Sequence, residues 1–155
     1  MRIEADCIYV IPPNTELSVV NNRLNLARPT EPRGLRLPIN VLFSSLASTQ
    51  GQHAIGVILS GMGSDGTLGA QAIKAIGGLT LIQEPSTAQF DSMPKSAIEA
   101  GCADIVIPAA AMPARIQTYF ASLQPPNHGG QELTAPLQQI VKLLHQQTRH
   151  DFSLY

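Results

Sequence analysis

The sequence predicts an α/β fold, half of a doubly wound, mostly parallel, Rossmann-like three-layer sheet preceded by a β-hairpin and followed by a C-terminal helix. Apolar segments without polar alternation are separated by helical patterns, which is typical of parallel βαβ units covered on both faces. Glycines follow the first three expected helices after the hairpin and stop them. The chain of 155 residues, 44% of them hydrophobic, is long enough for a real core.

The first part of the chain contains a predicted strand and a predicted hairpin. Residues 7–11 form the expected strand, which two prolines close. Residues 17–20 and 23–27 flank two adjacent asparagines, which tolerate the positive φ of a tight hairpin turn. Residues 28–38 hold three prolines and three arginines and are expected to be a surface loop.

A helix and an alternating series of strands and helices follow. Pro38 starts the helix, one face of which is apolar, and Gly51 stops it. After it we expect three strands, each followed by a helix. These elements are predicted at residues 54–59, 67–76, 79–83, 94–100, 104–107 and 111–123.

The last part of the chain differs in composition. Residues 124–135 contain two prolines and two glycines among polar residues and are predicted to be a linker. An amphipathic helix opens residues 136–155, and too little chain follows to bury its apolar stripe. A further domain is therefore expected to begin there, after a first domain over residues 1–123.

Composition excludes several function classes. A net charge of −1 offers no basic surface for nucleic acid and no polybasic membrane anchor. The longest apolar runs fall short of the ~20 residues of a membrane span, and the first residues lack the apolar core of a signal peptide. Cys7 and Cys102 lie in apolar surroundings and are predicted to be buried free thiols, which fits a reducing, cytoplasmic location.

The most informative segment is the loop in which an apolar strand breaks into Gly61, Gly63 and Gly66 around Asp65. Open α/β sheets bind their ligands beyond such carboxyl ends of strands. Three interpretations compete. In the first, Asp65 is only the N-cap of the helix that follows, although a cap does not explain three clustered glycines.

In the second interpretation, Gly61-x-Gly63-x-x-Gly66 is a dinucleotide fingerprint with Glu84 ending the next strand, but the Asp65 carboxylate would repel the pyrophosphate. In the third, the loop presents backbone N–H groups and Asp65 orients a histidine, as in a hydrolase triad. The residues alone supply neither nucleophile nor base: no Gly-x-Ser-x-Gly elbow is present, and the four histidines are expected away from the loop.

These residues resemble the chemotaxis protein-glutamate methylesterase (CheB) family. The pattern of that family is a strand, Gly-Met-Gly-x-Asp-Gly, a helix ended by glycines and a strand ending in Gln, and later Phe-x-Gly-Met-Pro-x-x-Ala-Ile. The resemblance covers residues 5–122, and Ser92 departs from it where the family usually has Gly. Matching segments lie at residues 8–14, 37–47, 60–66, 77–78, 81–84 and 90–98.

The resemblance implies hydrolysis of γ-glutamyl methyl esters on chemoreceptors in chemotaxis signalling, without metal or cofactor. It implies that Asp65 is the triad acid and that the main-chain N–H of Met62 belongs to the oxyanion site. The family's serine and Gln-His pair have no counterpart here, so the isolated chain is expected to be inactive. Four residues are expected in the substrate region: Gly61, Gly63, Met93 and Pro94.

The resemblance also implies a partner, the cytoplasmic region of a methylated chemoreceptor, with no nucleic acid and no membrane insertion. Self-association through an exposed half-sheet is expected as well. Residues 137–144 and 148–155 resemble the opening of a chemoreceptor glutamate methyltransferase (CheR), which implies a methylesterase–methyltransferase fusion. Two alternatives stay open, a non-catalytic interaction module of a signalling protein and a dinucleotide-binding βαβ module.

Overall fold

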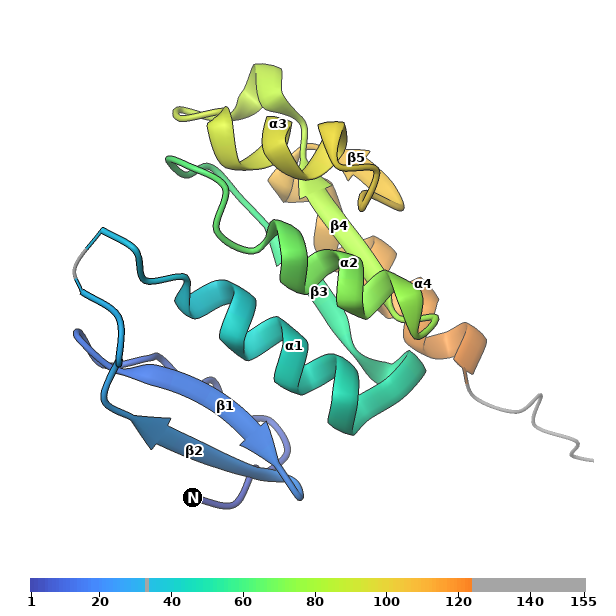
Figure 1. Cartoon of the computed structure of the whole chain (residues 1–155). Coiled ribbons are helices and arrows are strands. Elements are labelled where there is room, and N and C mark those ends of the chain that lie inside the picture. The colour runs from blue at the N-terminus through green and yellow to red at the C-terminus, as the bar shows by residue number, and fades with distance from the viewer. Residues whose placement is uncertain (33, 124–155) are drawn as a thin grey trace, which may run out of the picture. The chain divides into compact units, whose positions relative to one another are not determined.

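The computed structural model describes residues 1–32 and 34–123, which form a β-hairpin and a parallel sheet with helices (Figure 1). The hairpin pairs its strands antiparallel, and the parallel sheet has the order β3-β4-β5. The strands are β1 (Glu16–Val20), β2 (Arg23–Ala27), β3 (Ile55–Ile58), β4 (Leu79–Gln83) and β5 (Ile105–Ile107). The α-helices are α1 (Pro38–Gln50), α2 (Thr67–Ala75), α3 (Ser92–Glu99) and α4 (Met112–Leu123).

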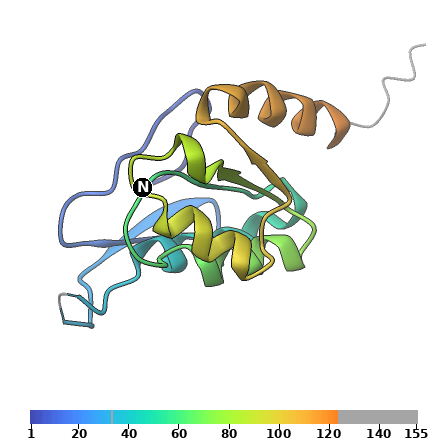
Figure 2. The ribbon, with the colours of Figure 1, turned by 90° about the horizontal axis from the view of Figure 1, so that it is seen from above.

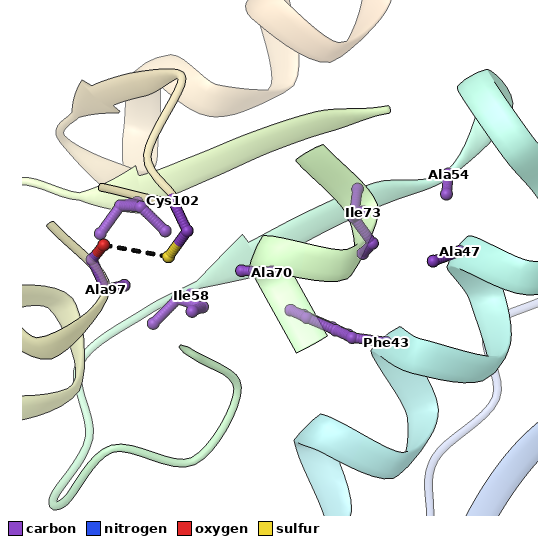
Figure 3. Close-up of a cluster of buried hydrophobic side chains, with 9 residues drawn as sticks. Phe43, Ala47, Ala54, Ile58, Ala70, Ile73, Ala97 and Cys102 are labelled. Atoms are coloured by element: carbon purple, nitrogen blue, oxygen red, sulfur yellow. Dashed lines mark hydrogen bonds between the residues drawn. The ribbon is translucent and has the colours of Figure 1, made fainter. Parts of the chain in front are cut away.

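Helices cover both faces of the parallel sheet, which confirms the predicted three-layer α/β architecture. Figure 2 shows α4 on one face and α1, α2 and α3 on the other. The core beneath α1–α3 includes Phe43, Ile58 and Ile73 (Figure 3). Leu81 and Met112 belong to the core beneath α4. Every residue of β4 is buried because this central strand has neighbours on both edges and both faces.

The hairpin and α1 pack together as the sequence predicts. Asn21 and Asn22 have φ values of 50° and 59°, the positive angles that a two-residue turn requires. Leu17 and Val19 point inward and are buried. The hydroxyl of Ser45 in α1 accepts a hydrogen bond of 2.9 Å from the Val19 N–H, which fixes the hairpin against the helix.

The predicted boundaries hold closely from α1 to α4. Helix α3 begins at Ser92, two residues before the predicted start. The helices α1, α2 and α3 end at or just before glycines with positive φ, at Gly51, Gly77 and Gly101. The predicted linker and final helix, residues 124–155, lie outside the described residues. Among the described helices, none has the length and hydropathy to cross a membrane.

The prediction of a strand at residues 7–11 is wrong. Ile8 and Val10 expose 93% and 83% of their surface, and in the described part of the chain no strand pairs with this segment. Strand propensity reflects packing against paired neighbours, so an apolar run without a neighbour stays irregular. Cys7 is consequently exposed, which corrects the prediction of a buried thiol, whereas Cys102 is buried and free as predicted. Burial raises the pKa of the Cys102 thiol.

Asp104 joins the central strand to the turn before β5. Its Oδ2 accepts from the N–H of buried Thr80 at 2.9 Å, and its Oδ1 lies 3.2 Å from Nζ of Lys74. Burial, the largest single effect, raises the pKa of Asp104, but the hydrogen bonds from Thr80 and Lys74 together hold it below its ordinary value of 3.8. The carboxylate is therefore more favourable in the folded chain than in the unfolded one.

Asp104→Asn is expected to lower the free energy of unfolding by about 1–2 kcal/mol at pH 7, because a charged acceptor is lost from Thr80 and Lys74. The contribution of a carboxylate with a depressed pKa is present above its unfolded pKa and is lost as pH falls through the folded value. The deficit should therefore shrink below about pH 4. Urea unfolding at pH 7 and at pH 3.5 measures it.

The matched control is Asp91→Asn, which removes the exposed pair between Asp91 and Lys95. Exposed pairs contribute little, so this variant should unfold like the parent at both pH values. An Asp104→Asn deficit that is equal at pH 7 and pH 3.5 would contradict the role given to the ionised carboxylate.

Candidate functional site

The candidate site is the loop of residues 59–66 at the carboxyl end of β3, which leads into α2 (Figure 1). It carries the three glycines, Met62 and Asp65 that the sequence singles out. The side chain of Met62 is 75% exposed. Hydrogen bonds connect this loop to α1 on one side and to the start of α3 on the other.

The Asp65 carboxylate binds the N-terminus of α1. Oδ2 accepts from the N–H of Ile39, and Oδ1 accepts from the N–H of Asn40, both at 3.0 Å. The residue before α1 is Leu37, whose side chain cannot cap the helix. The N–H groups of the first turn therefore need an acceptor from elsewhere in the chain, and Asp65 supplies it. A negative charge at a helix N-terminus is also favoured by the helix dipole.

Asp65 is therefore not the cap of the helix that follows it, and the first sequence interpretation is wrong on this point. The residue preceding α2 is Gly66, which has no side chain to cap with. Its φ of +95° favours glycine, and a Cβ there would lie 2.9 Å from Cγ2 of Ile39. The glycine lets the chain turn so that Asp65 points to α1.

Helix α1, which Asp65 caps, in turn supplies a cap to α2. The side-chain Oδ1 of Asn40 in α1 accepts from the N–H of Gly69 in the first turn of α2, at 2.9 Å. A side chain on Gly69 would collide with Phe43 and approach Cα of Asn40 to 3.2 Å, so glycine permits the close contact of the helices. Sequence reasoning gave Asn40 no role, and only its position near a helix N-terminus hinted at one.

The N–H of Met62 lies between two loop N–H groups that each have an acceptor. The N–H of Gly61 donates to the carbonyl of Phe90 at 2.9 Å, and that of Gly63 donates to the hydroxyl of Ser92 at 3.0 Å. Among residues 1–32 and 34–123, no acceptor meets the N–H of Met62. The unused N–H of Met62 is thus flanked by two N–H groups whose positions are held, which is the kind of donor that an oxyanion site requires.

The predicted substrate region is brought together only in part. Gly61 lies against Met93, because a Cβ on this glycine would collide with the Met93 sulfur, and the Met93 N–H donates to the Gly61 carbonyl at 3.1 Å. Gly63 has a φ of +86° with open space around it. Pro94, by contrast, is fully buried, so its side chain supports α3 and is not offered to a ligand.

Gln83 is a buried polar residue that ties two strand ends together. Its Oε1 accepts from the N–H of Ser60 at 2.8 Å, and its Nε2 donates to the carbonyl of Thr87 at 3.0 Å. The hydroxyl of Ser60 in turn accepts from the N–H of Phe90 at 2.9 Å. The signal in the sequence is one amide that ends an otherwise apolar strand, because a buried amide needs partners on both of its atoms.

No base lies beside Asp65 in the described part of the chain. His53 is exposed in the short 3₁₀ helix before β3, at the end of that strand opposite to the loop, as predicted. The other histidines of the sequence lie outside the described residues. Within residues 1–32 and 34–123, no three His, Cys, Asp or Glu side chains cluster as metal ligands would.

Comparison with known sequences assigns the family. The family described as CheB methylesterase matches residues 1–116 of this chain. The chain belongs to the CheB methylesterase family. A protein-glutamate methylesterase/protein-glutamine glutaminase of Thiobacillus denitrificans is 36% identical over 118 residues, which cover 74% of this chain and 33% of that protein. An uncharacterised 104.1 kDa protein of Rhodobacter capsulatus is 45% identical over 104 residues, 67% of this chain and 11% of that protein.

A solved structure confirms the fold. The crystal structure of the Thermotoga maritima CheB methylesterase catalytic domain is similar with a TM-score of 0.62 and 31% identity, over 70% of this chain and 59% of that chain. The chain thus spans a third of the Thiobacillus methylesterase and more than half of the Thermotoga domain. The methylesterase resemblance is confirmed, and the dinucleotide and interaction-module alternatives are not favoured.

The capping contacts yield a prediction about stability. Asp65→Ala should lower the free energy of unfolding by about 2 kcal/mol, since two N–H groups of α1 lose a charged acceptor. Asp65→Asn should cost about 1 kcal/mol, because an amide offers one oxygen and turns its NH₂ toward the second donor. Urea unfolding measures both. An Asp65→Asn variant as stable as the parent would mean that only one oxygen matters.

Proposed function

We propose that this chain contributes the acid and an oxyanion-binding donor to a protein-glutamate methylesterase. The observation that carries the proposal is the pairing, in one loop of a CheB-family chain, of a carboxylate held at both oxygens with the unused N–H of Met62. The substrates are γ-glutamyl methyl esters of a chemoreceptor's cytoplasmic region, and the cell compartment is the cytoplasm.

The reaction is acyl transfer through a serine and a histidine supplied by a segment other than the described residues. The serine hydroxyl attacks the ester carbonyl while the histidine takes its proton, and the tetrahedral intermediate expels methanol. Water then attacks the acyl-enzyme, which releases the glutamate carboxylate and regenerates the serine. The N–H of Met62 donates to the oxyanion of both intermediates, where negative charge develops.

Asp65 can serve the histidine and α1 at once. Each carboxylate oxygen has two lone pairs, and α1 uses one on each oxygen through the N–H groups of Ile39 and Asn40. A lone pair therefore remains for the N–H of an imidazole. Accepting that bond would fix the histidine tautomer and stabilise the imidazolium.

The same chemistry extends to an amide. Relatives such as the Thiobacillus protein are named protein-glutamine glutaminases as well as methylesterases. An oxyanion donor and a triad act on the carbonyl of a primary amide as on an ester, with ammonia leaving in place of methanol. Deamidation of receptor glutamines is therefore proposed as a second reaction of the same site.

The domain organisation also belongs to this proposal. Residues 1–123 would be the C-terminal half of a methylesterase domain, 124–135 a linker and 136–155 the start of a methyltransferase domain. Self-association remains a prediction too, since β3 and β5 have no strand beyond them in the described sheet.

Asp65→Asn in a complete methylesterase domain containing this chain is expected to lower kcat by about 10⁴, the effect of the equivalent exchange in a serine protease. The amide favours the wrong histidine tautomer and cannot stabilise an imidazolium. Methanol release from methylated receptor measures turnover, and thermal unfolding measures folding.

Asn40→Ala is the matched control for Asp65→Asn. It removes the cap on α2, at a cost of about 1 kcal/mol, and leaves both bonds to the Asp65 carboxylate in place, because these come from main-chain groups. It should keep near-normal turnover at similar stability. If both variants retain equal turnover, the acid role of Asp65 is wrong.

The chain of 155 residues alone is expected to release no methanol from methylated receptor. A loop amide and an acid without nucleophile and base give at most weak catalysis. Activity that persists after repurification, and that disappears when a serine of this chain is replaced, would place the reactive centre elsewhere.

A further inference from the structure

Ser92 holds the loop on both sides of Met62. Its hydroxyl accepts from the N–H of Gly63 at 3.0 Å and donates to the carbonyl of Gly61 at 3.1 Å. The hydroxyl thus uses its single O–H donor and one of its two acceptor lone pairs. The two bonds reach the residues immediately before and after the free N–H of Met62.

These bonds matter because Ser92 is the only residue in the described part of the chain that binds the backbone on both sides of Met62. Gly61 and Gly63 carry no side chains, and Gly63 stands at a φ of +86° in open space. Glycine samples more backbone conformations than any other residue, so a loop of this kind is poorly oriented unless something holds it. Three other bonds reach these two glycines. The Gly61 N–H donates to the carbonyl of Phe90 at 2.9 Å, the Met93 N–H donates to the Gly61 carbonyl at 3.1 Å, and the Ser96 hydroxyl donates to the Gly63 carbonyl at 3.4 Å.

Capping of α3 does not account for Ser92. Ser92 is the first residue of α3, and the position before it, Asp91, makes no side-chain capping bond. Both bonds of the Ser92 hydroxyl go to the loop of residues 59–66. The side chain is also exposed, so it adds little to the core. Its contacts instead favour a role in orienting the main chain of Met62.

We propose that Ser92 is a positioning residue for the methylesterase reaction, which aims the N–H of Met62 at the oxyanion. This inference rests on the proposed function. At this position the methylesterase pattern has Gly, which cannot form either bond. The chain therefore uses a side-chain hydroxyl to fix an oxyanion donor that it does not itself contact.

The first test is amide exchange in the chain as it is. In NMR spectra of the 155-residue protein, Ser92→Ala should speed hydrogen exchange of the Gly63 amide by about five- to tenfold, the value of one hydrogen bond. Ser92→Thr keeps the hydroxyl and should keep the parent rate. An unchanged Gly63 rate in Ser92→Ala would overturn the contact and with it the proposal.

The second test is turnover of the complete methylesterase domain with methylated receptor. Removal of an oxyanion donor costs about 10²–10³ in kcat, so loss of its alignment should cost less, roughly tenfold, with KM unchanged. Ser92→Ala and Ser92→Gly should both show this loss, and Ser92→Thr should restore kcat. Ser48→Ala is the matched control, because that hydroxyl bonds only within α1, to the carbonyl of Ser44.

The outcomes separate the two proposals. An inactive parent domain would overturn the proposed function, whatever Ser92 does to amide exchange. An active parent with full kcat in Ser92→Ala and Ser92→Gly would overturn the positioning role and leave the function standing. A rise in KM at constant kcat would also overturn it, because that pattern indicates lost ground-state binding.

Discussion

The contact between Asp65 and the first turn of α1 is the interaction on which the rest of the site depends. It joins the loop after β3 to a helix about 25 residues earlier in the chain, through two hydrogen bonds of 3.0 Å. Asn40 of α1 in turn caps α2 by accepting from the N–H of Gly69. Neither helix has a side-chain cap from the residue before it, so α1 relies on Asp65 of the loop and α2 relies on Asn40 of α1 for N-terminal acceptors. The position of α1 and the shape of the loop are therefore fixed together.

A second set of polar contacts fixes the opposite side of the loop. Gln83 and Ser60 connect the carboxyl ends of β4 and β3 to the segment that leads into α3. Ser92 adds two hydrogen bonds to this set, one to Gly61 and one to Gly63. A loop held from both sides can leave the N–H of Met62 unpaired without losing its shape. That is the physical condition for an oxyanion donor, because it must be in place before charge develops.

Local chemistry in the sequence predicted the elements well and their long-range partners poorly. The two asparagines of the hairpin, Pro38 and the helix-ending glycines act on their own neighbours, so their positions could be read directly. The prediction of a strand at residues 7–11 was wrong because a strand needs a neighbouring strand, which this apolar segment does not itself specify. The prediction that Asp65 caps the next helix was wrong for the same reason. A carboxylate after a strand can cap either the next helix or a helix that lies beside it, and only the folded structure selects α1.

A carboxylate that binds the loop after β3 to α1 is also well placed to act as a triad acid. An acid that orients a histidine works only if its own direction is fixed, since a mobile side chain would let the imidazole rotate. The donors from Ile39 and Asn40 fix both oxygens of Asp65 at once. Because these donors belong to the main chain of a helix, they do not move with side-chain rotamers. In the proposed reaction, the two bonds that stabilise α1 are therefore the same bonds that orient the catalytic acid. A substitution of Asp65 changes both stability and catalysis. Only a control such as Asn40→Ala, which lowers stability alone, separates the two effects.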